Sequence, residues 1–185
     1  MSSERILVMG IGNPLVKDEG VGVRIIEEMM ATLAFPPNVT LMDAGTMGMG
    51  ILNLFRECDF MLVIDAVDGT GEAPGTVVRL APADFAPNQV LHSLHDIRFV
   101  DVLQASELIG SRPEADCIGV QIQDMQGVAI GLTPAVEAAI PAAIDAALAV
   151  LRERGVEATP LDGGSAEARL LESIRDGSEI GREPR

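Results

Sequence analysis

Three acidic residues follow apolar runs of the sequence, at places where an α/β protein can do chemistry. Glu19 comes after the run 6–9 and a glycine turn, Asp43 ends the run 39–42, and Asp65 ends the run 60–64. Open α/β sheets bind their ligands outside the carboxyl ends of the strands, and the first and third strands are commonly neighbours. Glu19 and Asp65 are therefore predicted to converge on one cleft.

A histidine would complete a metal site of this kind. The chain has two, His92 and His95, in the stretch VLHSLHDIRF. One imidazole nitrogen and two carboxylates leave positions on a divalent ion open for water or substrate, as catalytic sites do. A lone loop histidine is more often a surface hydrogen-bonding group, and side-chain chemistry alone does not choose between His92 and His95.

The glycine turn has two other interpretations. A strand, a glycine turn and a helix followed by Asp43 resemble half of a dinucleotide-binding fold. The turn GIGNPL lacks the third glycine of that motif, however, and the negative charges of Asp18 and Glu19 would oppose a phosphate at the helix start. In the structural interpretation, Asp18 or Glu19 only caps the helix, which is worth ~0.3–1 kcal/mol.

Strand and helix patterns alternate along the chain and would position these residues. Strands are predicted at 6–9, 39–42, 60–64, 76–80 and 117–122, and helices at 21–30, 51–55 and 97–109. A last helix should run from the N-cap Thr133 to about Arg154, interrupted at Pro141. The strand 76–80 follows too short a connection for a helical crossover, so we expect it to pair antiparallel with the strand before it.

These elements predict a three-layer αβα fold with a twisted, mostly parallel five-stranded sheet that carries one antiparallel strand. The 185 residues fit a single α/β domain, which we assign to 1–154. Residues 155–185 are rich in charge, glycine and turn residues, and we expect a partly flexible C-terminal extension with a short amphipathic helix near 165–174.

Composition excludes several classes of function. The formal net charge of −15 repels a nucleic-acid backbone, so we expect no nucleic-acid partner. No secretory signal and no apolar run near ~20 residues is visible, which predicts a cytoplasmic protein without a membrane partner. Cys58 and Cys117 lack a C-x-x-C spacing and are expected to act as small apolar residues beside or within strands.

Four blocks in order resemble one family. The stretches RILVMGIGNPLVKDEGVGVRIIEE, MDAGTMGMGIL, VIDAVDG with APGTVVRL, and GLTPAVEAAIPAAI closely resemble the hydrogenase maturation endopeptidases, over Arg5 to Arg154. The resemblance implies a protease that removes the C-terminal extension from the large-subunit precursor of a nickel–iron hydrogenase after nickel insertion. The precursor would be its partner, and we expect the protease to be a monomer.

The resemblance also implies roles for single residues. The metal-binding carboxylates of the family match Glu19 in KDEGVG and Asp65 in VIDAVD, and its histidine ligand matches His95. Asp43 in DAGT matches another implicated aspartate, so the implied catalytic set is Asp43, Glu19 and Asp65. The nickel would arrive with the substrate, and other divalent ions would also fit the site. The segment QIQDMQGVAIG departs from the family by lacking a Pro-Glu pair, in a place suited to contact substrate.

The mechanism and two alternative functions are left open by the residues. A divalent ion could lower the pKa of a bound water, or Asp43 could act as general base without catalytic metal. A non-enzymatic alternative is a nickel-sensing maturation chaperone that binds the precursor and leaves the cut to another protein. A dinucleotide-binding oxidoreductase is the less favoured alternative.

Overall fold

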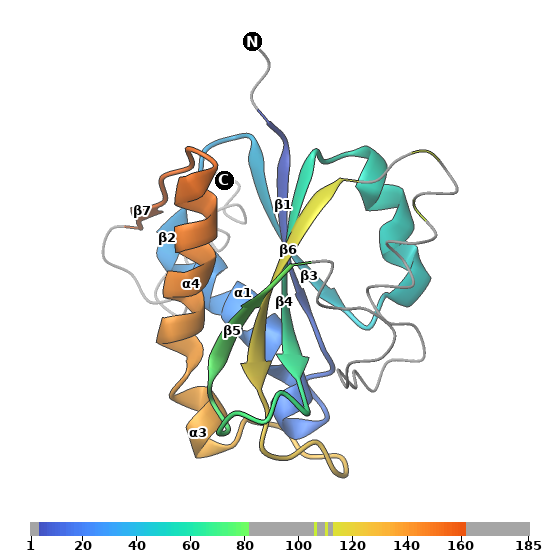
Figure 1. Cartoon of the computed structure of the whole chain (residues 1–185), viewed down its shortest axis with the longest axis vertical. Helices are drawn as coiled ribbons and strands as arrows, with labels where there is room; N and C mark the ends of the chain where they lie inside the picture. Colours follow the sequence, from blue (N-terminus) through green and yellow to red (C-terminus); the bar gives the residue numbers. More distant parts are fainter. Residues whose placement is uncertain (1–3, 82–105, 107–109, 111–112, 162–185) are drawn as a thin grey trace, which may run out of the picture.

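A five-stranded sheet forms the centre of the computed structural model, which describes residues 4–81, 106, 110 and 113–161. Its order is β3-β1-β4-β6-β5, and β5 alone is antiparallel (Figure 1). The strands are β1 (Ile6–Ile11), β3 (Val39–Gly45), β4 (Phe60–Val67), β5 (Val77–Leu80) and β6 (Glu114–Gln121). The predicted fold class is confirmed, including the single antiparallel strand.

The strands β1 and β4 are neighbours, as predicted for the first and third strands. Gly10 in β1 lies opposite Ile64 in β4 and opposite Asp43 in β3, so the carboxyl ends of all three strands are level. The turn after β1 and the acidic ends of β3 and β4 therefore share one edge of the sheet.

The predicted partner of β5 was wrong. This strand pairs antiparallel with β6 rather than with β4, because β6 lies parallel along the whole of β4, from Phe60 opposite Glu114 to Val67 opposite Gln121. With both sides of β4 occupied, β5 is left at the edge of the sheet. Its half-exposed residues and the charged Arg79 suit an edge strand.

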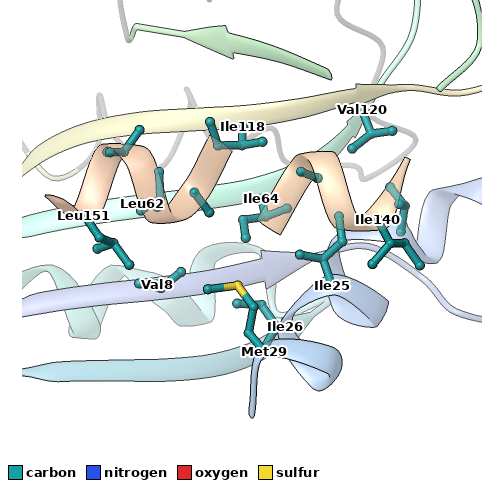
Figure 2. Close-up of a cluster of buried hydrophobic side chains, with 14 of the residues drawn as sticks. Val8, Ile25, Ile26, Met29, Leu62, Ile64, Ile118, Val120, Ile140 and Leu151 are labelled. Carbon is teal, nitrogen blue, oxygen red and sulfur yellow. The ribbon is translucent and has the colours of Figure 1, made fainter. Parts of the chain in front are cut away.

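Two long helices cover one face of the sheet. These are α1 (Val21–Thr32) and α4 (Ile140–Glu153), and their apolar residues interlock with those of β1, β4 and β6 (Figure 2). The short helix α3 (Pro134–Glu137) precedes α4, and the break between them confirms the predicted interruption. Pro141 lacks a backbone N–H donor and lies in the first turn of α4, where none is needed.

The stretch Pro134–Glu153 is long and apolar enough to cross a membrane by length and composition. Core helices give the same pattern, and the buried residues of α4 (Ile140, Ala143, Ala147, Val150 and Leu151) lie in the main core. The packing of α4 against the sheet thus accounts for its apolar residues.

The opposite face carries the 3-10 helix η2 (Gly48–Arg56), where the sequence predicted a helix at 51–55. Ile51 and Phe55 from η2 pack against a second apolar cluster that includes Met9 and Met61. Cys58 and Cys117 are buried, free thiols in this cluster, as expected for small apolar residues. The predicted helix 97–109 lies outside the described residues, apart from the buried Ser106.

The first residues after α4 pack back onto the domain. Val156 is buried in the main core, and β7 (Thr159–Pro160) pairs antiparallel with β2 (Leu33–Ala34). The Leu161 amide donates a hydrogen bond to the Thr32 carbonyl at 2.8 Å. The predicted helix near 165–174 and the rest of the extension lie outside the described residues.

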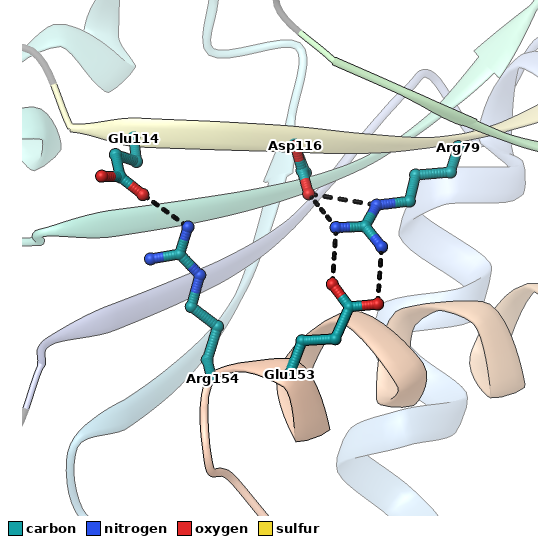
Figure 3. Close-up of polar contacts among 5 residues, drawn as sticks. All are labelled: Arg79, Glu114, Asp116, Glu153 and Arg154. Atoms are coloured by element: carbon teal, nitrogen blue, oxygen red, sulfur yellow. Dashed lines mark hydrogen bonds and ion pairs between the residues drawn. The ribbon is translucent and has the colours of Figure 1, made fainter.

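Ion pairs connect the edge of the sheet to α4 (Figure 3). Arg79 on β5 contacts Asp116 on β6 at 2.6 Å and Glu153 on α4 at 2.8 Å. Arg154 contacts Glu114 at 2.6 Å, and its guanidinium lies 3.7 Å from the centre of the Phe60 ring. Such exposed pairs contribute at most about 1 kcal/mol each, so they align elements that the apolar core holds together.

Candidate functional site

Close backbone contacts bring the start of α1 against the carboxyl ends of β1 and β4. A Cβ atom on Gly22 would lie 2.3 Å from the carbonyl oxygens of Ile11 and Ile64, and one on Gly10 would lie 2.2 Å from the Gly22 carbonyl. Side chains cannot fit in either place. The two glycines thus let α1 begin directly over the sheet edge.

The turn before α1 carries Glu19. It forms the 3-10 helix η1 (Lys17–Gly20), and the Glu19 amide donates to the Val16 carbonyl at 3.1 Å. A Cβ atom on Gly12, whose φ is +144°, would lie 2.0 Å from the Glu19 carbonyl oxygen. Glu19 is buried, with 6% of its surface exposed, so the turn keeps this acid at the sheet edge and largely away from bulk water.

Asp65 lies near the carboxyl end of β4 and is half-buried. Its Oδ1 atom accepts a hydrogen bond of 2.8 Å from the Ala66 amide. Burial raises the pKa of Asp65 to about 8, against the lowering effect of the Ala66 amide, and the charge of Glu19 raises it further. The structure therefore brings Glu19 and Asp65 within electrostatic reach of each other, as the sequence predicted.

Asp43 lies at the same sheet edge but on the far side of β1. The strand order β3-β1-β4 puts two strand spacings, about 10 Å, between the backbones of Asp43 and Asp65. Asp43 is exposed, and its Oδ1 atom accepts a 2.8 Å hydrogen bond from the Gly45 amide.

The predicted third ligand, His95, lies outside the described residues, as does His92. Among the residues that the structure describes, no three histidine, cysteine or acidic side chains are grouped so that they could hold a metal. The paired carboxylates nonetheless fit a divalent cation chemically. They are oxygen donors, and a positive charge between them would offset the burial and the charge of Glu19, which together raise the pKa of Asp65.

Asp18 has a role that the sequence interpretation missed. It is fully buried but makes no cap hydrogen bond to η1 or α1. Its Oδ2 atom accepts hydrogen bonds from the amides of Gln123 and Asp124 and from the Thr133 hydroxyl, each at 2.9 Å, and its Oδ1 atom accepts from the Thr133 amide at 2.6 Å. Asp18 thus fastens the loop between β6 and α3 to the turn that carries Glu19.

Local sequence holds no signal for this contact, because Asp18 and its partners are more than 100 residues apart. Thr133 was predicted as an N-cap, and it does precede α3 with an extended backbone. Its side chain contacts Asp18 instead of capping the helix. The sequence therefore correctly predicted Thr133 as the residue before the helix, while the hydrogen-bond partner of its side chain is set by the fold.

Comparison with known proteins shows similarity to proteins of one family. A family model described as hydrogenase maturation protease matches residues 23–150. The chain is 39% identical over 186 residues to the hydrogenase expression/formation protein HupD of Rhodobacter capsulatus, covering 97% of this chain and 86% of that protein. It is 40% identical over 160 residues to the hydrogenase 2 maturation protease of Escherichia coli, covering 84% of this chain and 96% of that protein.

A solved structure shares the fold. The hydrogenase maturating endopeptidase HybD from E. coli superposes with a TM-score of 0.76 at 40% identity, over 84% of this chain and 97% of that one. The match to HupD covers 97% of this chain, so Glu19 and Asp65 both lie within that shared length.

Proposed function

This chain belongs to the hydrogenase maturation protease family, a family of peptidases, and we propose that it removes the C-terminal extension of a nickel-loaded nickel–iron hydrogenase large-subunit precursor. The observation that carries the proposal is the placement of Glu19 and Asp65 at the carboxyl edge of the sheet, in a chain that matches a relative over 97% of its length. The proposal places the reaction in the cytoplasm and assigns it to the monomer.

Nickel enters this reaction as part of the substrate. Glu19 and Asp65 are the described residues that would contact it, and His95 is the third ligand that we propose. Bound there, the ion would polarise the scissile carbonyl or lower the pKa of a nearby water. Without nickel, Asp65 would keep its proton at neutral pH, because burial and the charge of Glu19 raise its pKa to about 8. A bound cation would draw both side chains into their charged form, which gives the site a reason to select the loaded precursor.

The chain's own residues supply orientation and proton transfer. The Ala66 amide fixes one oxygen of Asp65, and the η1 turn fixes Glu19. We assign Asp43 the role of general base, because it is an exposed carboxylate at the same edge. It would take a proton from water while the water oxygen bonds to the peptide carbonyl carbon. The C–N bond then breaks, and the amine of the released extension would take up that proton from Asp43.

Cleavage of a purified precursor tests this function. The protein is incubated with nickel-loaded and nickel-free precursor, and the mass of the large subunit is measured. We expect a shortened subunit only from the loaded form. Asp65→Asn should abolish cleavage, because it removes a negative charge from the pair, whereas Asp145→Asn, at an exposed position on α4, should cleave normally. An intact loaded precursor after incubation with the wild-type protein would refute the proposal.

A further inference from the structure

The loop between β6 and α3 lies beside the turn that carries Glu19 (Figure 1, yellow-orange loop and the start of α1). Ala129 forms an isolated parallel bridge with Val16. The Ala129 amide donates to the Leu15 carbonyl, and the Lys17 amide donates to the Ala129 carbonyl, both at 2.9 Å. The two segments therefore make one continuous rim at the carboxyl edge of the sheet.

Buried and ion-pair contacts hold this rim against the rest of the protein. Buried Asp18 binds both ends of the loop, and Lys17 forms an ion pair with Asp124. Met125 and Leu132 of the loop pack against the main core. The loop is thus anchored by polar and apolar contacts at both ends, and the side chains at its tip are held outward by a defined backbone.

Three large apolar side chains project from the rim. Leu15 is 53% exposed, Val128 is 84% exposed and Ile130 is 85% exposed. Glycines with positive φ angles, Gly127 and Gly131, bracket the last two. We call Leu15, Val128 and Ile130 the apolar lip. A backbone hydrogen bond joins the two parts of the lip. Ala129 lies between Val128 and Ile130, and its amide donates to the Leu15 carbonyl.

The charge of the rim differs from that of the whole molecule. Residues 13–17 and 123–132 contain one lysine and one aspartate, Lys17 and Asp124, in a chain whose formal net charge is −15. These two side chains pair with each other. The lip is therefore a neutral, apolar surface on a strongly acidic protein, and it is complementary to an apolar partner rather than a basic one.

The lip is also continuous with the catalytic turn. The Val16 carbonyl, between Leu15 and Lys17, accepts the Glu19 amide. On the basis of the function proposed above, we propose that the apolar lip docks an apolar segment of the hydrogenase large-subunit precursor next to the cleavage site. Docking there would place the scissile peptide bond at Glu19 and Asp65 and would contribute to choosing the client.

Steady-state cleavage separates docking from chemistry. Val128→Ser combined with Ile130→Ser removes apolar area without touching the core. We expect KM for the nickel-loaded precursor to rise roughly tenfold or more, with kcat changed less than about twofold. Val128→Ile with Ile130→Val keeps the lip apolar and should leave KM nearly unchanged. The matched control is Met30→Ser, at an exposed methionine on α1, which should also leave both constants unchanged.

Hydrogen exchange gives a readout that does not need turnover. Peptides covering 126–131 are followed in the Asp65→Asn protein with and without saturating precursor. Slower exchange on binding, absent in the double serine variant, would support docking at the lip. Unchanged exchange in the saturated complex would overturn it, whether or not the wild-type protein cleaves. If these peptides exchange more slowly at higher protein concentration in the absence of precursor, the lip is a site of self-association. That result would also overturn the proposal.

Loss of cleavage and loss of docking are distinguishable. A wild-type protein that binds at the lip but leaves the precursor intact would refute the proposed function and keep this inference. If the wild-type protein cleaves the precursor and the double serine variant has the same KM, the inference is refuted and the proposed function stands.

Discussion

Asp65 carries a carboxyl group whose surroundings oppose its charge. Burial is the main cause, and the negative charge of Glu19 adds to it. A carboxylic acid with a pKa near 8 is ionised only partly at neutral pH, so proton release becomes coupled to any cation that enters the site. The same feature that prepares the site for a metal therefore costs stability in the metal-free protein.

Stability of the metal-free protein should fall as the pH rises. The folded protein holds a proton on Asp65 up to about pH 8, whereas the ordinary pKa of this group is 3.8. The folded state thus binds more protons between these values, and its free energy of unfolding is highest below the lower one and declines toward the upper one. Urea denaturation from pH 5 to 9, with a chelator present, measures this decline.

Asp65→Asn provides the control for that decline. The asparagine oxygen can still accept the Ala66 amide, and the side chain has no charge to desolvate. The variant should lose most of this pH dependence and be more stable than the wild-type protein at pH 8, although we expect it not to cleave the precursor. Parallel stability curves for the two proteins would show that Asp65 is not the group responsible.

Asp18 and Glu19 are adjacent in sequence and do different work. Asp18 satisfies four hydrogen-bond donors from the loop before α3, so its charge is balanced by amides and a hydroxyl. Glu19 instead opposes the charge of Asp65. One residue builds the rim, and the other belongs to the carboxylate pair.

The contact between α1 and the sheet depends on the absence of a side chain at Gly22. In Gly22→Ala, the new Cβ would lie 2.3 Å from the Ile11 and Ile64 carbonyl oxygens, so α1 must move away from β1 and β4. Alanine favours a helix by up to about 1 kcal/mol over glycine, but overpacking of this kind costs about 1–3 kcal/mol. We expect a lower melting temperature than that of the wild-type protein. We also expect a loss of cleavage activity larger than this destabilisation alone would cause, because Glu19 moves with the helix.

Gly50→Ala is the matched control for that substitution. Its Cβ would lie 3.6 Å from the nearest atom, which belongs to the flexible side chain of Met47. This is an ordinary contact distance, so the variant should keep the wild-type melting temperature and activity. If Gly22→Ala behaved like Gly50→Ala, the close packing of α1 would not be what positions the catalytic turn.

The edge strand β5 shows how elements compete for places in a sheet. Its short connection from β4 correctly predicted an antiparallel strand. The position beside β4 went to β6, whose buried apolar residues gain more from the centre of the sheet. Arg79 then connects β5 to β6 and α4 through Asp116 and Glu153.

The whole molecule is strongly acidic, with 13 basic and 28 acidic residues. Repulsion among these charges destabilises the compact state, and salt screens it over a Debye length of about 10 Å at 0.1 M. We expect the melting temperature to rise by about 2–4 °C, or about 1 kcal/mol, between 10 mM and 0.3 M salt.

Sodium chloride and potassium chloride should act alike in that measurement, because screening does not depend on the identity of the ion. A melting temperature that falls with salt would mean that the ion pairs of Arg79 and Arg154 outweigh the general repulsion.

The sequence by itself determined much of the architecture and part of the site. Apolar periodicity is a local property, so it located the five strands of the main sheet, the helices α1 and α4 and the break just before Pro141, while the predicted helix 97–109 lies outside the described residues. Parallel strands deliver their carboxyl ends to one edge, which was enough to predict that Glu19 and Asp65 approach each other. The role of Asp43 and the nickel ligand His95 rest on the family resemblance, and they stay predictions.

Only the tertiary structure decided the contacts between distant segments. The pairing of β5 with β6, the anchoring of the loop by Asp18 and the projection of Leu15, Val128 and Ile130 each join residues far apart in the chain. Local propensity contains no term for such pairs. The buried carboxylate of Asp18 finds its donors only in the folded chain, and the loop that it anchors carries Val128 and Ile130 of the apolar lip.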